Sequence, residues 1–256
     1  LENVVGEIVL RDQSINLSKL NIQSNMGNGN LTMVYRAKNG QEATAGLDLD
    51  MEDVKVEKLI ALFPSIDTLV PMLRSFEGVL DCQVTATCKM DSTMSLIMPS
   101  INSSCYLHGN NMVLLDGETF TEISKTLMFK NKKRNMIDSI SVDLAIKDNK
   151  IEVFPFLVEM DRYKVAVGGT HNLDMTFNYH LSVLKSPVPF KLGIDITGNL
   201  DNFKDIFKPA KQAELDSTRK NIRKDIRDAV RKQIEEAAPE LGKDLALVKA
   251  ADVWEP

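Results

Sequence analysis

Residues 78–91 read GVLDCQVTATCKMD, and apolar and polar side chains alternate through this stretch without a break. Successive side chains of a β-strand point to opposite faces of a sheet, so the stretch predicts a long strand with one apolar and one polar face. The same period recurs over 140–146 and 173–183. A chain that keeps making one-sided strands needs a cover for the apolar side: another sheet, a few helices, or a bound apolar molecule.

The first third of the chain predicts a meander sheet. Apolar residues alternate over 31–37 and again over 43–51, and Asn39-Gly40 between them is a hairpin turn signal. A second turn is expected over 26–30, and a change of strand register near Ser18 and Lys19.

Later segments continue the sheet. Weaker strands are expected over 94–98, 104–107 and 112–115. Five further strands follow between 137 and 197, including one predicted over 172–184, and short turns such as Asp148-Asn149 favour antiparallel neighbours.

Helical period interrupts the strands in three places. Two short helices are expected within 54–74 and one over 118–129, all suited to cover an apolar sheet face. Residues 210–238 are rich in charge and carry a narrow apolar stripe, which predicts a long helix on a surface or in a coiled coil. The expected fold is mainly β, a curved antiparallel sheet that is groove-like or a partly open barrel or sandwich. The expected domains are 1–205 and a charged helical extension over 206–256.

Composition narrows the function classes. The chain has 256 residues and a net charge of −5, which disfavours nucleic acid as a partner. No stretch reaches the length needed to span a bilayer as a helix. Because the chain begins with Leu1 and a strand pattern follows at once, we expect a segment of a longer protein, with a targeting signal or membrane anchor in the missing part.

The sequence offers no convincing catalytic, metal or cofactor site. The three cysteines are too few for a disulfide scaffold and suit small buried apolar side chains. The acidic run over 48–53 lacks the spacing of a calcium loop, and Gly168-Gly169 lacks that of a phosphate loop. His180 falls on a polar strand face and is expected to be structural. A non-enzyme without metal or cofactor is therefore expected, while a hydrolase that uses His180 or His171 remains the rival.

Several motifs occur in a recognisable order. They are Asn111–Gly117 (NMVLLDG), Leu127–Phe129 (LMF), Ile140–Ile146 (ISVDLAI), Asp148–Ile151 (DNKI), Val165–Gly169 (VAVGG) and Ile194–Asn202 (IDITGNLDN). This order resembles the C-terminal region of the AsmA family, bacterial envelope proteins that include AsmA and TamB-like relatives. Asp148-Asn149 stands where the family usually has Asp-Gly, and the family's N-terminal membrane helix is not in this segment.

The resemblance implies a non-enzymatic periplasmic protein of a Gram-negative bacterium, anchored to the inner membrane in its full-length form. It implies a role in outer-membrane assembly and maintenance, with passage of phospholipid or another acyl-chain lipid along a hydrophobic β groove. The twelve methionines suit either ordinary core filling or such an adaptable groove. The expected lining residues are Leu80, Val84, Ala86, Met90, Leu144, Ile146, Met175, Phe177, Tyr179 and Leu181. The expected cover residues are Leu59, Phe63, Leu69 and Leu73.

An alternative to the groove stays open for these residues. The same side chains can form a closed core in which every apolar side chain packs against another, with no room for a bound lipid. The protein is then a structural scaffold, and the 210–238 helix is the segment expected to dock on an envelope protein partner.

Overall fold

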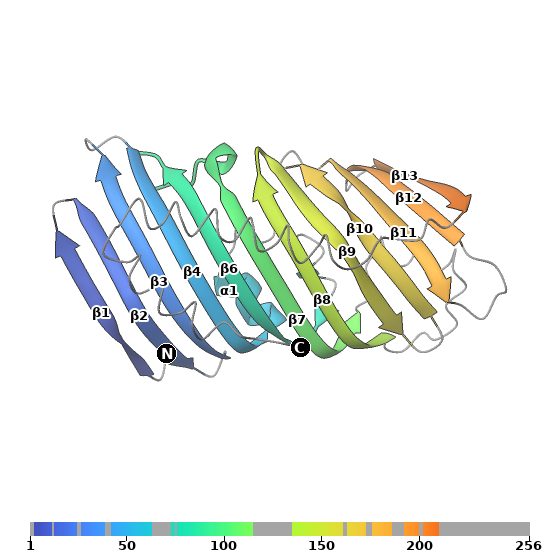
Figure 1. The fold of residues 1–256 in the computed structure, drawn as a ribbon, viewed down its shortest axis with the longest axis horizontal. Coiled ribbons are helices and arrows are strands. Elements are labelled where there is room, and N and C mark those ends of the chain that lie inside the picture. The colour runs from blue at the N-terminus through green and yellow to red at the C-terminus, as the bar shows by residue number, and fades with distance from the viewer. Residues whose placement is uncertain are drawn as a thin grey trace.

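The structure is a computed structural model that describes residues 3–11, 13–24, 27–38, 42–62, 73–74, 76–114, 135–160, 163–172, 176–185, 192–199 and 202–209. These residues form one antiparallel sheet of 13 strands in which chain neighbours are almost always sheet neighbours (Figure 1). The strands are β1 (Asn3–Arg11), β2 (Ser14–Ser24), β3 (Gly27–Lys38), β4 (Glu42–Lys55), β5 (Phe76–Glu77), β6 (Val79–Met90), β7 (Asn102–Leu114), β8 (Asn135–Lys147), β9 (Lys150–Met160), β10 (Tyr163–Asn172), β11 (Phe177–Lys185), β12 (Leu192–Asn199) and β13 (Asn202–Pro209).

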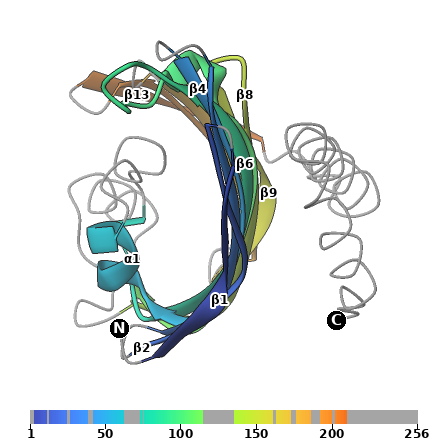
Figure 2. The same ribbon diagram turned by 90° about the vertical axis from the view of Figure 1, so that its left-hand side faces the viewer.

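The sheet bends into a trough. Figure 2 shows the strands curving around a concave side that holds the helix α1 (Val56–Leu62). Strands β1 and β13 stand at opposite ends of the strand order, and no pairing between described residues joins them. The predicted mainly β, curved antiparallel sheet is therefore confirmed, and it is an open meander rather than a closed barrel.

The alternation in residues 78–91 does what the sequence predicts. Leu80 and Cys82 are buried in the main core, and Val84 packs against it. On the other face, Thr85 donates a hydrogen bond to the Asp48 carboxylate at 2.7 Å. One strand thus serves an apolar concave face and a polar convex face.

Helix α1 covers part of the concave side. Val56 and Leu59 are buried in the main core and Ile60 packs against it, so three residues at helical spacing face the sheet. The backbone N–H of Val56 donates to the carbonyl of Gly78 at 3.1 Å, which ties the start of the helix to the β5–β6 junction. Gly78 has φ +147, and a Cβ there would lie 2.7 Å from the sulfur of Met112, so this junction requires glycine.

Two local predictions are confirmed by the backbone. The pairing of β2 with β3 shifts between Leu17 and Leu20, and Lys19 has φ +50 at that point, as expected for the register change. Asp148 and Asn149 have φ +52 and +62 between the paired Lys147 and Lys150, which is the geometry of a two-residue hairpin turn.

The segment 94–98 is not a strand. Apart from one bridge between Met90 and Leu96, it is a loop that leads into a short 3₁₀ turn, Met98–Ser100. The Asp91 carboxylate accepts hydrogen bonds from the backbone N–H groups of Thr93 and Ser95 at 2.8 and 3.0 Å. A side chain that captures local N–H groups in this way competes with strand pairing.

Other strand boundaries also differ from the prediction. The turn expected over 26–30 is misplaced, because Ser24 of β2 already pairs with Gly27, and residues 27–30 belong to β3, where Gly29 pairs with Met51. Segments 104–107 and 112–114 belong to one continuous strand, β7, and Leu115 lies outside the described residues. The strand expected over 172–184 is interrupted, since β10 ends at Asn172, whose N–H donates to the carbonyl of Thr176 before β11 begins.

Several predicted features lie outside the described residues. These are the second helix of the 54–74 pair apart from Leu73 and Arg74, the 118–129 helix and the 210–238 helix. The predicted domain boundary at residue 205 falls inside β13.

Candidate apolar trough

The concave face carries an apolar row that crosses most of the sheet. The strand registers align one residue from each strand from β2 to β12, leaving out the two-residue β5. The members are Leu20, Leu31, Leu49, Val84, Cys105, Leu144, Val153, Gly169, Tyr179 and Ile196. No member carries a charge. At about 4.8 Å between neighbouring strands, ten strands place the ends of the row roughly 43 Å apart.

A cavity of about 80 Å³ lies on this face, between the floor of the trough and residues that enter from the covering side. Its lining residues come from β5 to β11 and the covering Leu73, and are apolar except at one histidine. They are Leu73, Phe76, Leu80, Leu107, His108, Gly109, Met112, Ile140, Val142, Leu144, Ile151, Val153, Phe156, Val167 and Tyr179. The space suits hydrocarbon rather than a polar ligand.

One glycine sets the shape of the floor. A Cβ at Gly169 would lie 2.3 Å from the carbonyl oxygen of Asn178 and 2.7 Å from the ring of Tyr179. Because the glycine leaves this space empty, the Tyr179 ring can lie across β10. Burial raises the pKa of Tyr179 to about 12, as expected for a phenol in apolar surroundings.

The predicted lining and cover residues fall into four groups. Leu73, Leu80, Leu144 and Tyr179 line the cavity. Val84 and Leu59 belong to the main core cluster around the cavity. Leu181 and Phe177 pack in a second cluster with Tyr179. Ile146 packs in a third cluster with Ile101. Ala86 and Met90 are half-buried further along β6. Met175, Phe63 and Leu69 lie outside the described residues.

The prediction missed all of the lining contributed by β9 and β10. Ile151, Val153, Phe156 and Val167 all face the cavity. The pairing of β9 with β10 shifts register between Val167 and Gly169, so the two-residue period breaks there. Ile140 and Val142 also line the cavity and were missed, although their alternation with polar residues in the sequence was a signal that could have identified them.

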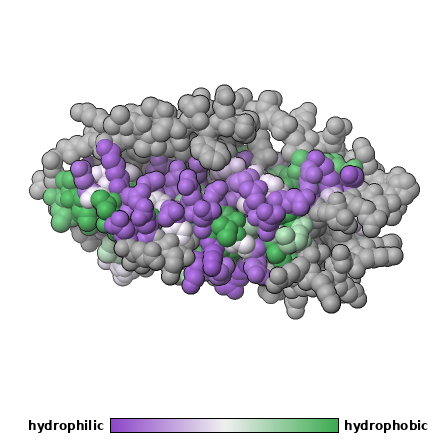
Figure 3. All heavy atoms as spheres, turned by 90° about the horizontal axis from the view of Figure 1, so that it is seen from below, coloured by the Kyte–Doolittle hydropathy of each residue, from purple (hydrophilic) through white to green (hydrophobic). Residues whose placement is uncertain are grey.

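The trough is exposed at the β1 end. Val4, Ile8 and Leu10 pair with the concave-facing residues Ile22, Leu17 and Ile15 of β2. Their side chains are 45%, 62% and 69% exposed. Figure 3 shows an apolar area at this end of the molecule. The floor therefore changes from covered at its centre to open at β1.

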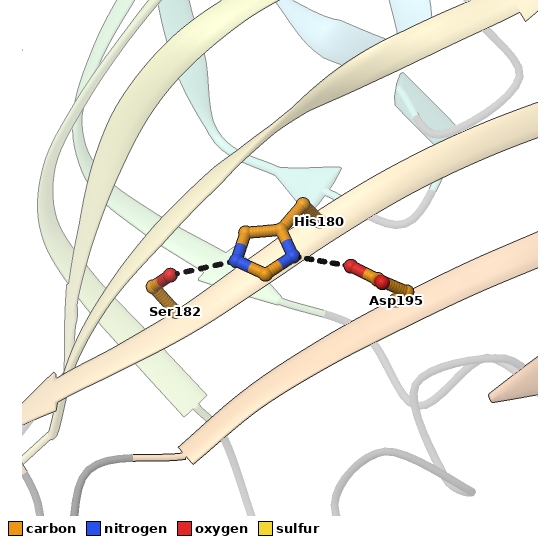
Figure 4. Close-up of polar contacts among 3 residues, drawn as sticks. All are labelled: His180, Ser182 and Asp195. Atoms are coloured by element: carbon orange, nitrogen blue, oxygen red, sulfur yellow. Dashed lines mark hydrogen bonds and ion pairs between the residues drawn. The ribbon is translucent and has the colours of Figure 1, made fainter. Parts of the chain in front are cut away.

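A serine, a histidine and an aspartate meet on the opposite, convex face (Figure 4). His180 Nδ1 contacts Asp195 Oδ1, and His180 Nε2 lies 2.9 Å from Ser182 Oγ. His180 pairs directly with Asp195 across β11 and β12, and Ser182 is two residues along the same strand. Register alone therefore brings the three together, and the predicted structural, hydrogen-bonded histidine is what the geometry supports.

This trio lacks two features of a hydrolytic centre. Ser182 is only 1% exposed, so a substrate carbonyl cannot approach its hydroxyl. Strand β11 lies between β10 and β12, so its backbone N–H groups serve the sheet pairing and are not directed at a developing oxyanion.

The cysteines behave as apolar side chains. Cys82, Cys88 and Cys105 are free thiols. A hydrogen bond with Cys82, together with burial, raises the pKa of Cys105 well above its ordinary value, and burial raises that of Cys88. Protonated thiols are poor nucleophiles and metal ligands. Within the described residues no group of three His, Cys, Asp or Glu side chains could hold a metal ion.

Searches among family models, curated proteins and solved structures found no match to this chain. Among the described helices, none has the length and apolar character to cross a membrane. The geometry itself defines the class: an open, trough-shaped antiparallel sheet whose concave face is apolar across ten strands.

Proposed function

We propose that this protein binds the acyl chains of a phospholipid, or of another acyl-chain lipid, along the concave face and conducts them across the strands. The observation that carries the proposal is the uncharged row from Leu20 to Ile196, which continues from the covered centre toward the open β1 end. The row is roughly 43 Å long, longer than the hydrocarbon core of a bilayer at about 30 Å. Each CH₂ buried on such a surface contributes roughly 0.8 kcal/mol.

The size of the cavity decides where a chain enters. At about 80 Å³ it is smaller than the engineered cavity of about 150 Å³ that admits benzene in another protein. An acyl chain therefore first contacts the exposed floor at β1 and β2, and it advances toward β6 only when the cover formed by α1 and Leu73 shifts. The proposed binding is coupled to movement of the cover.

The cellular setting of the proposal comes from the resemblance to the AsmA family. A periplasmic location, an inner-membrane anchor in the full-length protein and a role in outer-membrane assembly are parts of this proposal. A trough that binds lipid by apolar contact needs no catalytic group, which agrees with a non-enzymatic role.

Photocrosslinking tests the proposal at matched positions. Tyr179 lines the cavity, Tyr35 lies on the concave side nearer the open end, and Tyr106 lies on the convex face, opposite Gln83 and Asp143. Replacing each tyrosine in turn by benzoylphenylalanine keeps an aromatic side chain at all three sites. Irradiation in cells, followed by mass spectrometry of protein purified without detergent, identifies any attached lipid.

We expect lipid adducts at Tyr35 and Tyr179 and none at Tyr106. Adducts at Tyr35 alone would limit binding to the open end of the trough. Equal labelling at Tyr106, or no adduct at either concave position together with no copurified lipid, would overturn the proposal.

The alternative is a scaffold with a closed core, and the burial of the central floor favours it. Leu80 and Leu144 are only 4% and 3% exposed, because other side chains of the protein pack against them. In this alternative the 210–238 segment docks a protein partner. Deleting residues 210–238 distinguishes the two functions, because a scaffold loses its partner while a lipid-binding trough keeps its lipid.

A further inference from the structure

A band of side chains on the convex face of the sheet is buried. Its members stand an odd number of residues from the concave row on their own strands, so they point to the opposite face. Thr85, Ser104 and Ala145 are aligned across β6, β7 and β8. The convex band consists of Val34 (1% exposed), Thr85 (2%), Ser104 (7%), Ala145 (6%), Ala166 (3%) and Ser182 (1%).

Burial stops on either side of this band. On β3, the convex-facing residues Asn30 and Arg36 are exposed on the two sides of Val34, roughly 20 Å apart along the strand. On β8, Ser139 is exposed on the same face as Ala145. The cover over the band is therefore narrow. A helix is about 10–12 Å wide and fits this width, whereas a second sheet would bury the whole face.

The cover is not one of the described elements. Helix α1 lies on the concave side (Figure 2), and the described strands pack against their neighbours within the sheet. The structure contains one chain, so the cover comes from another part of that chain. From β3 to β11 the band crosses roughly 34 Å. The helix predicted over 210–238 has a length of about 43 Å, whereas residues 115–134 as a helix would reach only about 30 Å.

The charge of this segment matches the surroundings of the band. Residues 219–232 contain seven lysines and arginines and two aspartates, a net charge of +5. Carboxylates flank the band, since Asp48 pairs with Thr85 and Asp143 lies two residues from Ala145. Asp143 is only 5% exposed, and a carboxylate is buried at low cost only beside cations or hydrogen-bond donors. A basic cover supplies both.

The apolar pattern of the segment matches the band as well. Ile222, Ile226 and Val230 recur every four residues and form the narrow stripe of the predicted helix. The band offers Val34 at one end and small side chains such as Ala145 along its centre, over which a helix can lie close to the strands.

We infer that residues 210–238 bind the convex band of their own chain, as a helical brace across the strands. A helix in contact with strands from β3 to β11 at once fixes the curvature of the trough from behind. The basic segment is then engaged within the chain, and it is not the docking arm for a separate protein.

Crosslinking in the full chain tests this inference without reference to lipid. Tyr106 lies on the convex face two residues from Ser104, and Tyr35 lies on the concave face. Benzoylphenylalanine at position 106 should attach to residues 210–238 within a product of monomer mass, and at position 35 it should not. Peptide mass spectrometry identifies the attached residues. No attachment from position 106, attachment only in a product of dimer mass, or equal attachment from position 35 would overturn the inference.

Thiol accessibility tests the role of charge. A maleimide should modify Ala145→Cys slowly and Ser139→Cys rapidly, with each site read from its own peptide so that the native thiols do not interfere. Adding Arg223→Glu together with Arg227→Glu should speed modification at position 145 by about tenfold and leave position 139 unchanged. Lysine at both arginine positions should keep the protection. Rapid modification at position 145 in the otherwise native chain, or no response to the glutamate pair, would contradict the brace.

Discussion

The covered centre of the trough and its open β1 end use the same strand pattern with different results. At the centre, Ile137 on β8 is 0% exposed, while Ile8 on β1 is 62% exposed. Both regions alternate apolar and polar side chains along antiparallel strands. What differs is the cover, since α1, Leu73 and Phe76 pack against the central floor. Alternation therefore makes an apolar face, and the cover decides whether that face is buried core or exposed surface.

The largest expected effect is on the free energy of unfolding, when the same Ile→Ala substitution is made in each of the two regions. Ile137→Ala should destabilise the protein by about 2–5 kcal/mol, because it leaves a cavity in a packed core. Ile8→Ala should change stability by no more than about 0.5 kcal/mol, because the side chain is already exposed. Denaturant unfolding of both variants measures the difference. Equal losses would mean that the β1 end is as well packed as the centre.

The second effect measures how dry the covered centre is. The pKa of Tyr179 is about 12 in the folded protein against an ordinary value of 10.0. Between these values the unfolded chain loses the phenolic proton and the folded chain keeps it, so stability falls as pH rises, by roughly 1.4 kcal/mol per unit. This contribution is complete below pH 10. Denaturant unfolding from pH 9 to 12 should show a smaller fall for Tyr179→Phe than for the native chain. An identical fall in both would show that water reaches the phenol.

The alternation of apolar and polar residues predicted the strands best where one face of the strand was apolar and the other polar. The long strand β6, the register change at Lys19 and the Asp148-Asn149 turn all rest on neighbours in the sequence, and all three are confirmed. The loop over 94–98 was mistaken for a strand because its four apolar residues outweighed Asp91, whose carboxylate accepts hydrogen bonds from the N–H groups of Thr93 and Ser95. Hydrogen bonding of that kind depends on the conformation of one side chain, and the alternation of apolar and polar residues in the sequence carries no information about it.

The sequence predicted which residues of some strands face the trough, but not where along the trough these residues lie. Leu80, Leu144 and Tyr179 were found because the two-residue period places them on the apolar face. No local pattern shows that Leu144 and Tyr179 share one row while Leu80 lies outside it, since the registers of six strand pairs join Val84 to Ile196. The local pattern also does not show which part of the row is covered. Helix α1 contacts β4, which precedes it in the chain, and β5, which follows it, so its position depends on the folded sheet.

A smaller effect concerns polar contacts on the convex face. Ser182→Ala removes the partner of His180 Nε2 at a buried position, and we expect a loss of about 1–2 kcal/mol. Asn30→Ala removes the exposed hydrogen bond from Asn21 near the open end, and a change below about 0.5 kcal/mol is expected. Unfolding measurements compare the two. Ester hydrolysis by the native chain that disappears in Ser182→Ala would instead favour the hydrolase.

The smallest effect tests whether the central cavity is usable space. Val153→Ile adds one methylene to the cavity lining and should stabilise the protein by about 0.5–1 kcal/mol while lowering the lipid retained on purification without detergent. Val4→Ile adds the same group at a side chain that is 45% exposed, so stability should not change measurably. Thermal unfolding and lipid extraction on both variants give the comparison. If Val153→Ile destabilises the protein, the centre is already fully packed, an acyl chain has no space there, and the closed scaffold becomes the better account of the central strands.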